Sequence, residues 1–369
     1  MRGGALVALA VLAASTAHAA KVVRGPYLQL VGAHAATVVW KTDTPAACAV
    51  ELHGPDGASR RVTGGHGKRC AVAVDDLAPG AAYEYVPLAD GAALTGTSQF
   101  RTDDPAAPFA FLVLGDSGCG CEMQRAVAAR MEATPADFLL HTGDMVYEEG
   151  AAADFDAKLF APYAMLLRRL DLWPTLGNHD IRTSDGTPWR HAFRTPANNP
   201  DHDAGYYSFD HGNAHVVVLN SSADTRPGSR QRAFLDADLG ASHATWKFVV
   251  FHHTIYSSGY HGSNLKLRAN LLPVLDSHAV DVVFMGHDHD YERTLPLRAN
   301  AQVAPGAGTV YVTTGGGGDA LRPVGTSPFT ARAEATFHFV RVAIDGKKLT
   351  ATMLRADGTV GDELTLEKP

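Results

Sequence analysis

The first hundred residues alternate short apolar runs with clusters of turn residues. GPDG, TGGHG and APG separate the runs, and Gly, Pro and Asp in such clusters favour turns. The predicted strands are residues 37–41, 48–52, 70–74 and 82–86. Short strands at regular spacing are typical of a β-sandwich. We therefore predict an all-β domain over residues 20–104, which ends in a Pro-rich segment.

From residue 109 the pattern changes to buried strands that alternate with helical segments. The predicted strands are residues 109–114, 137–141, 172–176, 215–219, 246–251, 280–285 and 309–313, and the predicted helices are 123–133, 154–168, 229–238 and 265–277. This alternation predicts an α/β architecture, in which ligands bind at the carboxyl ends of the strands. The tail returns to strands. We therefore predict a second domain over residues 105–369, with a C-terminal β region from about residue 336.

Composition and the N-terminus add a cellular context. The chain has 369 residues, 46% of them hydrophobic, which is ordinary for a globular protein. Its net charge of −7 gives no support for a nucleic acid partner or an anionic membrane surface. Arg2, an apolar run over residues 5–14 and the sequence Ala17-His18-Ala19 predict a signal peptide over residues 1–19. No stretch is apolar for long enough to predict a membrane span. We expect a secreted or periplasmic protein, and the sequence does not predict its oligomeric state.

The chain has four cysteines, and in an exported protein these suggest disulfides. Cys48 and Cys70 lie in two predicted strands of the first domain, so we favour a bridge between them. For Cys119 and Cys121, a local bridge and two free thiols both stay open.

Five short polar motifs stand at the ends of apolar runs in the second domain. In chain order they are GDSG with Asp116, GDMVY with Asp144 and Tyr147, GNHD with Asn178 and His179, VVFHH with His252, and GHDH with His287 and His289. Each motif alone is weak evidence, because Gly-Asp after a strand is commonly a turn. Together they place many oxygen and nitrogen donors at one sheet edge, where burial without a ligand would be costly. The set therefore predicts a metal site.

The order of these motifs resembles the purple acid phosphatases of the metallophosphoesterase superfamily, over residues 109–294. RGPYLQ at residues 24–29, followed by TVVWKT, resembles their N-terminal fibronectin type III-like domain, and residues 337–366 resemble their C-terminal β region. The resemblance implies a fibronectin type III-like sandwich followed by an α/β metallophosphoesterase domain. In that domain two sheets lie between outer helices, in an α-β-β-α arrangement.

The resemblance also implies two metal ions bridged by Asp144. It places Asp116, Tyr147 and His289 on one ion, and Asn178, His252 and His287 on the other. The first set is hard and anionic, which suits Fe(III), whereas the second suits Fe(II), Zn or Mn. Many members of the superfamily have Asp-x-His at the first motif. This chain has Asp116-Ser117-Gly118 there, and Tyr147 supplies the missing ligand.

The implied activity is that of an acid phosphatase, which hydrolyses small phosphate monoesters by attack of metal-bound hydroxide. His179 would approach the substrate oxygens, and His261 would contact the substrate or protonate the leaving group. For His261 the alternative is an exposed loop histidine. Two other functions stay open: hydrolysis of phosphodiesters or nucleotides at the same site, or a surface-binding protein with a vestigial metal site. No expected ligand position is replaced in this chain.

Two further features lie close to these motifs. The Gly-rich run at residues 313–318 lacks the Gly-Lys-Ser/Thr ending of a phosphate loop, so we predict a tight turn whose backbone passes close to the site. Asp290, next to His289, is a candidate acceptor that orients a ligating histidine.

Overall fold

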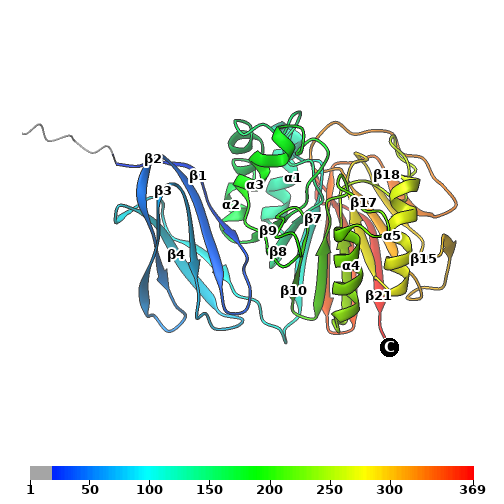
Figure 1. Ribbon diagram of the computed structural model, residues 1–369, viewed down its shortest axis with the longest axis horizontal. Helices are drawn as coiled ribbons and strands as arrows, with labels where there is room; N and C mark the ends of the chain where they lie inside the picture. The colour runs from blue at the N-terminus through cyan, green and yellow to red at the C-terminus, as the bar shows by residue number, and fades with distance from the viewer. Residues whose placement is uncertain (1–18) are drawn as a thin grey trace, which may run out of the picture.

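The computed structural model describes residues 19–369 (Figure 1), so the predicted signal peptide lies outside the described residues except for Ala19. The N-terminal strands, blue to cyan in Figure 1, lie at one end of the molecule. They are β1 Val22–Gln29, β2 Ala36–His53, β3 Ser59–Val74, β4 Ala82–Ala89, β5 Ala92–Ala93 and β6 Ser98–Arg101. The first domain is therefore all-β, as predicted, while its assignment as a fibronectin type III domain stays a prediction.

The core of the N-terminal domain forms around strand β2. Trp40 and Val50 of β2 are buried against Tyr85 of β4, and a Cys48–Cys70 disulfide links β2 to β3. The predicted strands 37–41 and 48–52 belong to this one strand, because the intervening residues form irregularities in the β2–β3 register and not a turn. The disulfide agrees with the favoured pairing.

Two sheets build the second domain. The first has the order β21-β20-β19-β7-β8-β9 and continues through β1 into the N-terminal strands, while the second has the order β10-β11-β12-β13-β17-β14-β18. The strands of the first sheet are β7 Phe109–Leu114, β8 Phe138–His141, β9 Asp171–Pro174, β19 His338–Asp345, β20 Lys348–Arg355 and β21 Val360–Glu367. Those of the second are β10 Tyr207–His211, β11 Ala214–Val218, β12 Trp246–Val250, β13 Val282–Met285, β14 Tyr291–Thr294, β17 Val310–Thr314 and β18 Thr330–Glu334. A separate hairpin is formed by β15 Leu297–Arg298 and β16 Ala301–Gln302.

The two sheets pack face to face because their strands are apolar on both sides. Phe111 of β7 and Phe284 of β13 point into the shared core, with ring centroids 6.2 Å apart. The neighbouring Leu112 of β7 faces outward and packs with Met131 of α1, while Val283 of β13 packs with the helices α4 and α5. The helices are α1 Glu122–Glu132, α2 Ala164–Leu167, α3 Thr187–Ala192, α4 Arg230–Ala241 and α5 Leu265–Ser277. The α-β-β-α prediction is therefore confirmed.

Three local predictions were wrong or incomplete. The helix expected over residues 154–168 is broken into the π-helix η1 Asp156–Phe160, a turn and the short α2. Residues 181–204, where no helix was predicted, contain the 3₁₀ turn η2 Ser184–Gly186 and helix α3, whose Trp189 is fully buried. Strands β10, β14 and β18 were not predicted. Within residues 19–369, no helix has the length and apolar character needed to span a membrane.

Candidate metal centre

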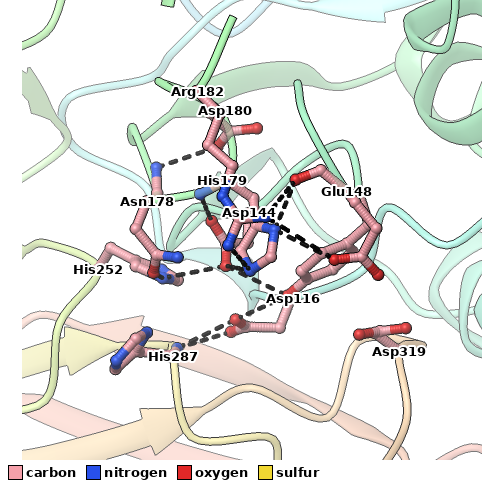
Figure 2. A network of polar contacts seen from close by, with 12 residues as sticks. Asp116, Asp144, Glu148, Asn178, His179, Asp180, Arg182, His252, His287 and Asp319 are labelled. Atoms are coloured by element: carbon pink, nitrogen blue, oxygen red, sulfur yellow. Dashed lines mark hydrogen bonds and ion pairs between the residues drawn. The ribbon is translucent and has the colours of Figure 1, made fainter. Parts of the chain in front are cut away.

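Loops that follow parallel strands of both sheets carry the predicted ligands. Asp116 follows β7, Asp144 follows β8, and His287 follows β13. All three adopt left-handed backbone conformations, with φ of 57°, 52° and 69° respectively. Such conformations are costly for residues other than glycine and concentrate at functional sites. The sharp turns bring side chains from both sheets to one place, at the carboxyl ends of the strands (Figure 2).

The first group of donors surrounds the Tyr147 hydroxyl. This oxygen lies 3.1 Å from Asp116 Oδ1 and 3.3 Å from Asp144 Oδ2. It is also 3.1 Å from Nε2 of His289. All four side chains are buried. The residues assigned to the first metal ion are thus in mutual contact.

The second group meets at the other side of Asp144. Nε2 of His252 lies 3.3 Å from Asp144 Oδ2 and 3.1 Å from Asn178 Oδ1. Asp144, His252 and His287 each offer a ligand atom within 4.8 Å of the others. Figure 2 shows Asp144 between the side chains of Asn178 and His252 and that of Asp116. Asp144 is therefore the carboxylate that both groups share.

Backbone carbonyls fix the direction of two imidazoles. Nδ1 of His252 is 3.0 Å from the Thr142 carbonyl, and Nδ1 of His289 is 2.8 Å from the Ala320 carbonyl. Because a carbonyl oxygen only accepts, Nδ1–H donates to each of these oxygens, so Nε2 of each ring faces the site and would be the atom that coordinates a metal ion. These carbonyls could not be identified from the sequence.

The electrostatics of the buried donors fit a cation. Burial raises the pKa of Tyr147, and the carboxylates of Asp116 and Asp144 raise it further. Burial also raises the pKa of Asp116. Burial alone would lower the pKa of His252, but Asp144 outweighs this and raises it to about 9. Among residues 19–369, no Lys or Arg side chain hydrogen-bonds to these acidic oxygens, and a bound metal cation would favour a tyrosinate beside the two carboxylates.

Glycines allow the backbone to approach the acidic side chains. A Cβ at Gly177 would lie 2.1 Å from Asp144 Oδ1, and one at Gly286 would lie 2.4 Å from Asp116 Oδ2. Gly315, in the Gly-rich run, also lies close to Asp116, because its Cβ would be 2.9 Å from Asp116 Oδ2. Residues 313 and 314 of the run end β17, residues 315–318 form a loop beside the site, and no helix follows before β18 within the described residues.

Two buried carboxylates outside the predicted set hold the loops in place. Asp180 accepts hydrogen bonds from the backbone N–H groups of Met145, Val146 and Gly177 at 3.0–3.3 Å. Asp288 accepts from the backbone N–H of His261 at 2.7 Å. Both residues were visible in the GNHD and GHDH motifs, but their backbone partners could only be found in three dimensions.

The expectation for Asp290 was wrong. Within residues 19–369, neither of its two buried carboxylate oxygens has a hydrogen-bond partner, so it orients no histidine there. Carbonyl oxygens perform that role instead, because Nδ1 of each imidazole lies against the backbone.

The two predicted catalytic histidines flank the metal ligands. Nδ1 of His179 lies 2.7 Å from the Glu148 carbonyl, which leaves its Nε2 3.9 Å from Asp144 Oδ2. The His261 ring stacks on the His287 ring with centroids 4.1 Å apart. Both imidazoles thus lie next to the donor cluster.

The remaining cysteines are also close to this loop region. Cys119 and Cys121 form a disulfide directly after the Asp116 turn, so the local bridge is the alternative that the structure supports.

Comparison with known proteins agrees with this geometry. Residues 109–291 match the calcineurin-like phosphoesterase family, and residues 19–105 match DUF7800, a domain of unknown function. Purple acid phosphatase 21 of Arabidopsis thaliana is 31% identical over 295 residues, which cover 73% of this chain and 66% of that protein. The chain belongs to the purple acid phosphatase family of metallophosphoesterases. It spans just under two thirds of the length of this curated relative.

Two solved structures share the fold across nearly the whole chain. Purple acid phosphatase PPD1 from yellow lupin (Lupinus luteus) seeds superposes with a TM-score of 0.84 at 20% identity, covering 93% of this chain and 74% of that one. PhoD superposes with a TM-score of 0.72 at 12% identity, covering 96% and 90% respectively. As a member of the purple acid phosphatase family, this protein is expected to have a binuclear metal centre.

Proposed function

We propose that this purple acid phosphatase family member is an exported acid phosphatase that hydrolyses small phosphate monoesters at a two-metal centre. One observation carries the proposal: the Asp144 carboxylate lies in contact with two separate groups of donors. A carboxylate in that position can bridge two cations, which is the arrangement that two-metal hydrolases use.

The ligand sets follow from the two groups. Asp116, Tyr147 and His289 would hold a trivalent iron, and the divalent ion (Fe, Zn or Mn) would lie among three donors on the other side of Asp144, namely Asn178, His252 and His287. Such a pair supplies Lewis acidity toward phosphate oxygens and lowers the pKa of water. The anionic side chains only partly compensate the charge of the two cations, which leaves a positive site for a phosphate dianion.

Two histidines of this chain would act on the substrate itself. His179 is fixed by the Glu148 carbonyl through Nδ1, and only as an imidazolium, with a proton on Nε2, would it donate to a phosphate oxygen. His261, which stacks on His287, would give a proton to the departing alkoxide. Loss of that proton donor matters most when the leaving group is strongly basic.

Export is supported by two features of the chain. Residues 1–19 have the pattern of a signal peptide, and the two disulfides are typical of an oxidising compartment. We also propose a domain division after residue 104, in the segment between the end of β6 and the start of β7.

The test is hydrolysis of p-nitrophenyl phosphate and bis(p-nitrophenyl) phosphate across pH 4–9 with parallel metal analysis. We expect faster turnover of the monoester, with an optimum below pH 7, and loss of activity together with loss of metal in Asp144→Ala. Preference for the bis ester would overturn monoester specificity in favour of a phosphodiesterase. No hydrolysis of either ester by protein loaded with two metal ions would overturn the proposed enzyme function and favour the surface-binding alternative.

A further inference from the structure

A buried histidine lies between the turns that carry Asp116 and Asp144 and belongs to neither proposed ligand set. His141 is the last residue of β8, and only 1% of it is exposed. Its Nε2 lies 2.8 Å from Oγ of Ser117, the residue after Asp116. Its Nδ1 accepts a hydrogen bond at 3.2 Å from the backbone N–H of Gly143, the residue before Asp144. Each nitrogen of this ring therefore contacts a residue next to an acidic ligand.

The direction of both hydrogen bonds follows from the chemistry of the groups. A backbone N–H only donates, so Nδ1 of His141 is the unprotonated nitrogen of a neutral imidazole. The proton is then on Nε2, which donates it to the Ser117 hydroxyl oxygen. Both side chains are buried, so removing either one leaves a polar atom of the other without a partner. Both ring nitrogens are already occupied, so His141 is not an additional metal ligand.

A backbone contact closes these hydrogen bonds into a ring. The Asp116 N–H donates to the Gly143 carbonyl at 3.0 Å, so three hydrogen bonds connect Asp116, Ser117, His141 and Gly143. Asp116 and Asp144 have φ of 57° and 52°, conformations that persist only when the surrounding structure holds them. The ring joins the loop after β7 to the loop after β8 and supports both turns.

The Gly143 peptide has little room to move without disturbing the proposed ligands. A Cβ at this position would lie 2.8 Å from Nδ1 of His252 and 2.9 Å from Cα of Gly177. The carbonyl of Gly143 holds Asp116, and Asp144 is the next residue in the chain. A shift of this peptide would therefore reach ligands of both proposed metal ions.

We propose that Ser117 and His141 form a positioning pair that fixes the separation of the Asp116 and Asp144 carboxylates, and with it the affinity of the site for the first metal ion. This role rests on the proposed two-metal phosphatase function. It concerns the placement of ligands, because neither residue of the pair is itself assigned to a metal ion or to the substrate.

The experiment measures the affinity for the first metal ion by competition with a chelator, together with the visible spectrum of the iron-loaded protein. Ser117→Ala should weaken this affinity about 10- to 100-fold, the loss typical when a group that orients a metal ligand is removed. The charge-transfer band should shift as Asp116 moves relative to Tyr147. With both metal ions saturating, kcat for p-nitrophenyl phosphate should fall while KM changes less than about twofold.

Two variants at the histidine separate a specific hydrogen bond from a loss of packing. His141→Phe removes both polar contacts, whereas the amide of His141→Gln can still donate to Ser117 and should restore part of the affinity. In the double variant Ser117→Ala/His141→Phe, the loss should be close to that of His141→Phe alone, because the two residues act through one contact. The matched control is Ser208→Ala in β10, a buried serine whose Oγ accepts from Nδ2 of Asn198 at 3.1 Å. It should keep the wild-type affinity and spectrum.

The outcomes distinguish this inference from the proposed function. If the wild type with two bound metal ions hydrolyses no phosphate ester, the proposed function fails, and the affinity and the spectrum still decide the role of the pair. A Ser117→Ala protein with an unshifted band and an affinity within about twofold of wild type would overturn the inference. Losses from Ser117→Ala and His141→Phe that simply add in the double variant would also overturn it.

Discussion

Replacing Gly177 by alanine is expected to displace Asp144 without any change to a proposed ligand. The new methyl carbon would lie 2.1 Å from Asp144 Oδ1 and 2.2 Å from the Asp144 backbone nitrogen. Carbon and oxygen atoms in ordinary contact are about 3.5 Å apart, so the carboxylate or its loop must move by more than about 1 Å. Gly177 has no left-handed backbone conformation, so the effect is steric and local.

The magnitude follows from the position of the displaced group. A shift of about 1 Å in a catalytic constellation can cost on the order of 100-fold in rate. Overpacking of this kind also costs about 1–3 kcal/mol of folding free energy. We expect kcat/KM for p-nitrophenyl phosphate to fall about 100-fold in Gly177→Ala, with less than two metal ions bound per chain and a folded protein by circular dichroism.

The control is an alanine at a glycine with open space. A Cβ at Gly65 meets nothing within 4 Å, and Gly65 has no left-handed φ, so Gly65→Ala should match the wild type. A Gly177→Ala protein that retained full metal content and more than half of the wild-type kcat/KM would refute the placement of Asp144 at the centre of the site.

Three further predictions test other parts of the account. Tyr147→Phe should abolish the visible charge-transfer absorption of the iron-loaded protein, because Tyr147 is the one tyrosine among the seven proposed ligands. An unchanged spectrum would refute the assignment of Tyr147 as an iron ligand. His261→Ala should slow hydrolysis of alkyl phosphates more than that of p-nitrophenyl phosphate, and equal slowing would remove its role as a proton donor. Burial raises the pKa of Asp171 in β9 to about 8, despite the hydrogen bond from the Val31 N–H at 3.1 Å. Between about pH 4, near the pKa of an unfolded Asp, and pH 8, the folded state therefore holds a proton that the unfolded state loses, so this residue lowers stability as pH rises. Asp171→Asn should raise Tm at pH 8 but not at pH 4 in thermal unfolding, and an unchanged pH dependence of Tm would contradict the shift.

Much of the fold could be predicted because its strands and helices have strong local patterns. Strand β7 and helix α5 have the bounds that the apolar pattern predicts. Strand β10 was missed because it follows a polar, Asn- and Asp-containing insertion and pairs with β11 through a tight turn. The break between η1 and α2 was missed because apolar residues recur at helical spacing on both sides of it. The backbone hydrogen bonds nevertheless change, from the π-helical pattern of η1 through a turn to the α-helical pattern of α2.

The candidate ligands could be found from the sequence because each stands at a strand end in a short motif. Their geometry depends on contacts that have no local pattern. The Thr142 and Ala320 carbonyls orient two imidazoles, and any residue type could supply a carbonyl oxygen at those positions.

The most direct test of the central claim is anomalous diffraction from crystals of the metal-loaded protein. We predict two metal peaks per chain on either side of the Asp144 carboxylate, one next to the Tyr147 hydroxyl and the other next to Nε2 of His252, at a separation of about 3.5–4 Å. A single peak, or two peaks that do not share Asp144, would contradict a bridged two-metal site.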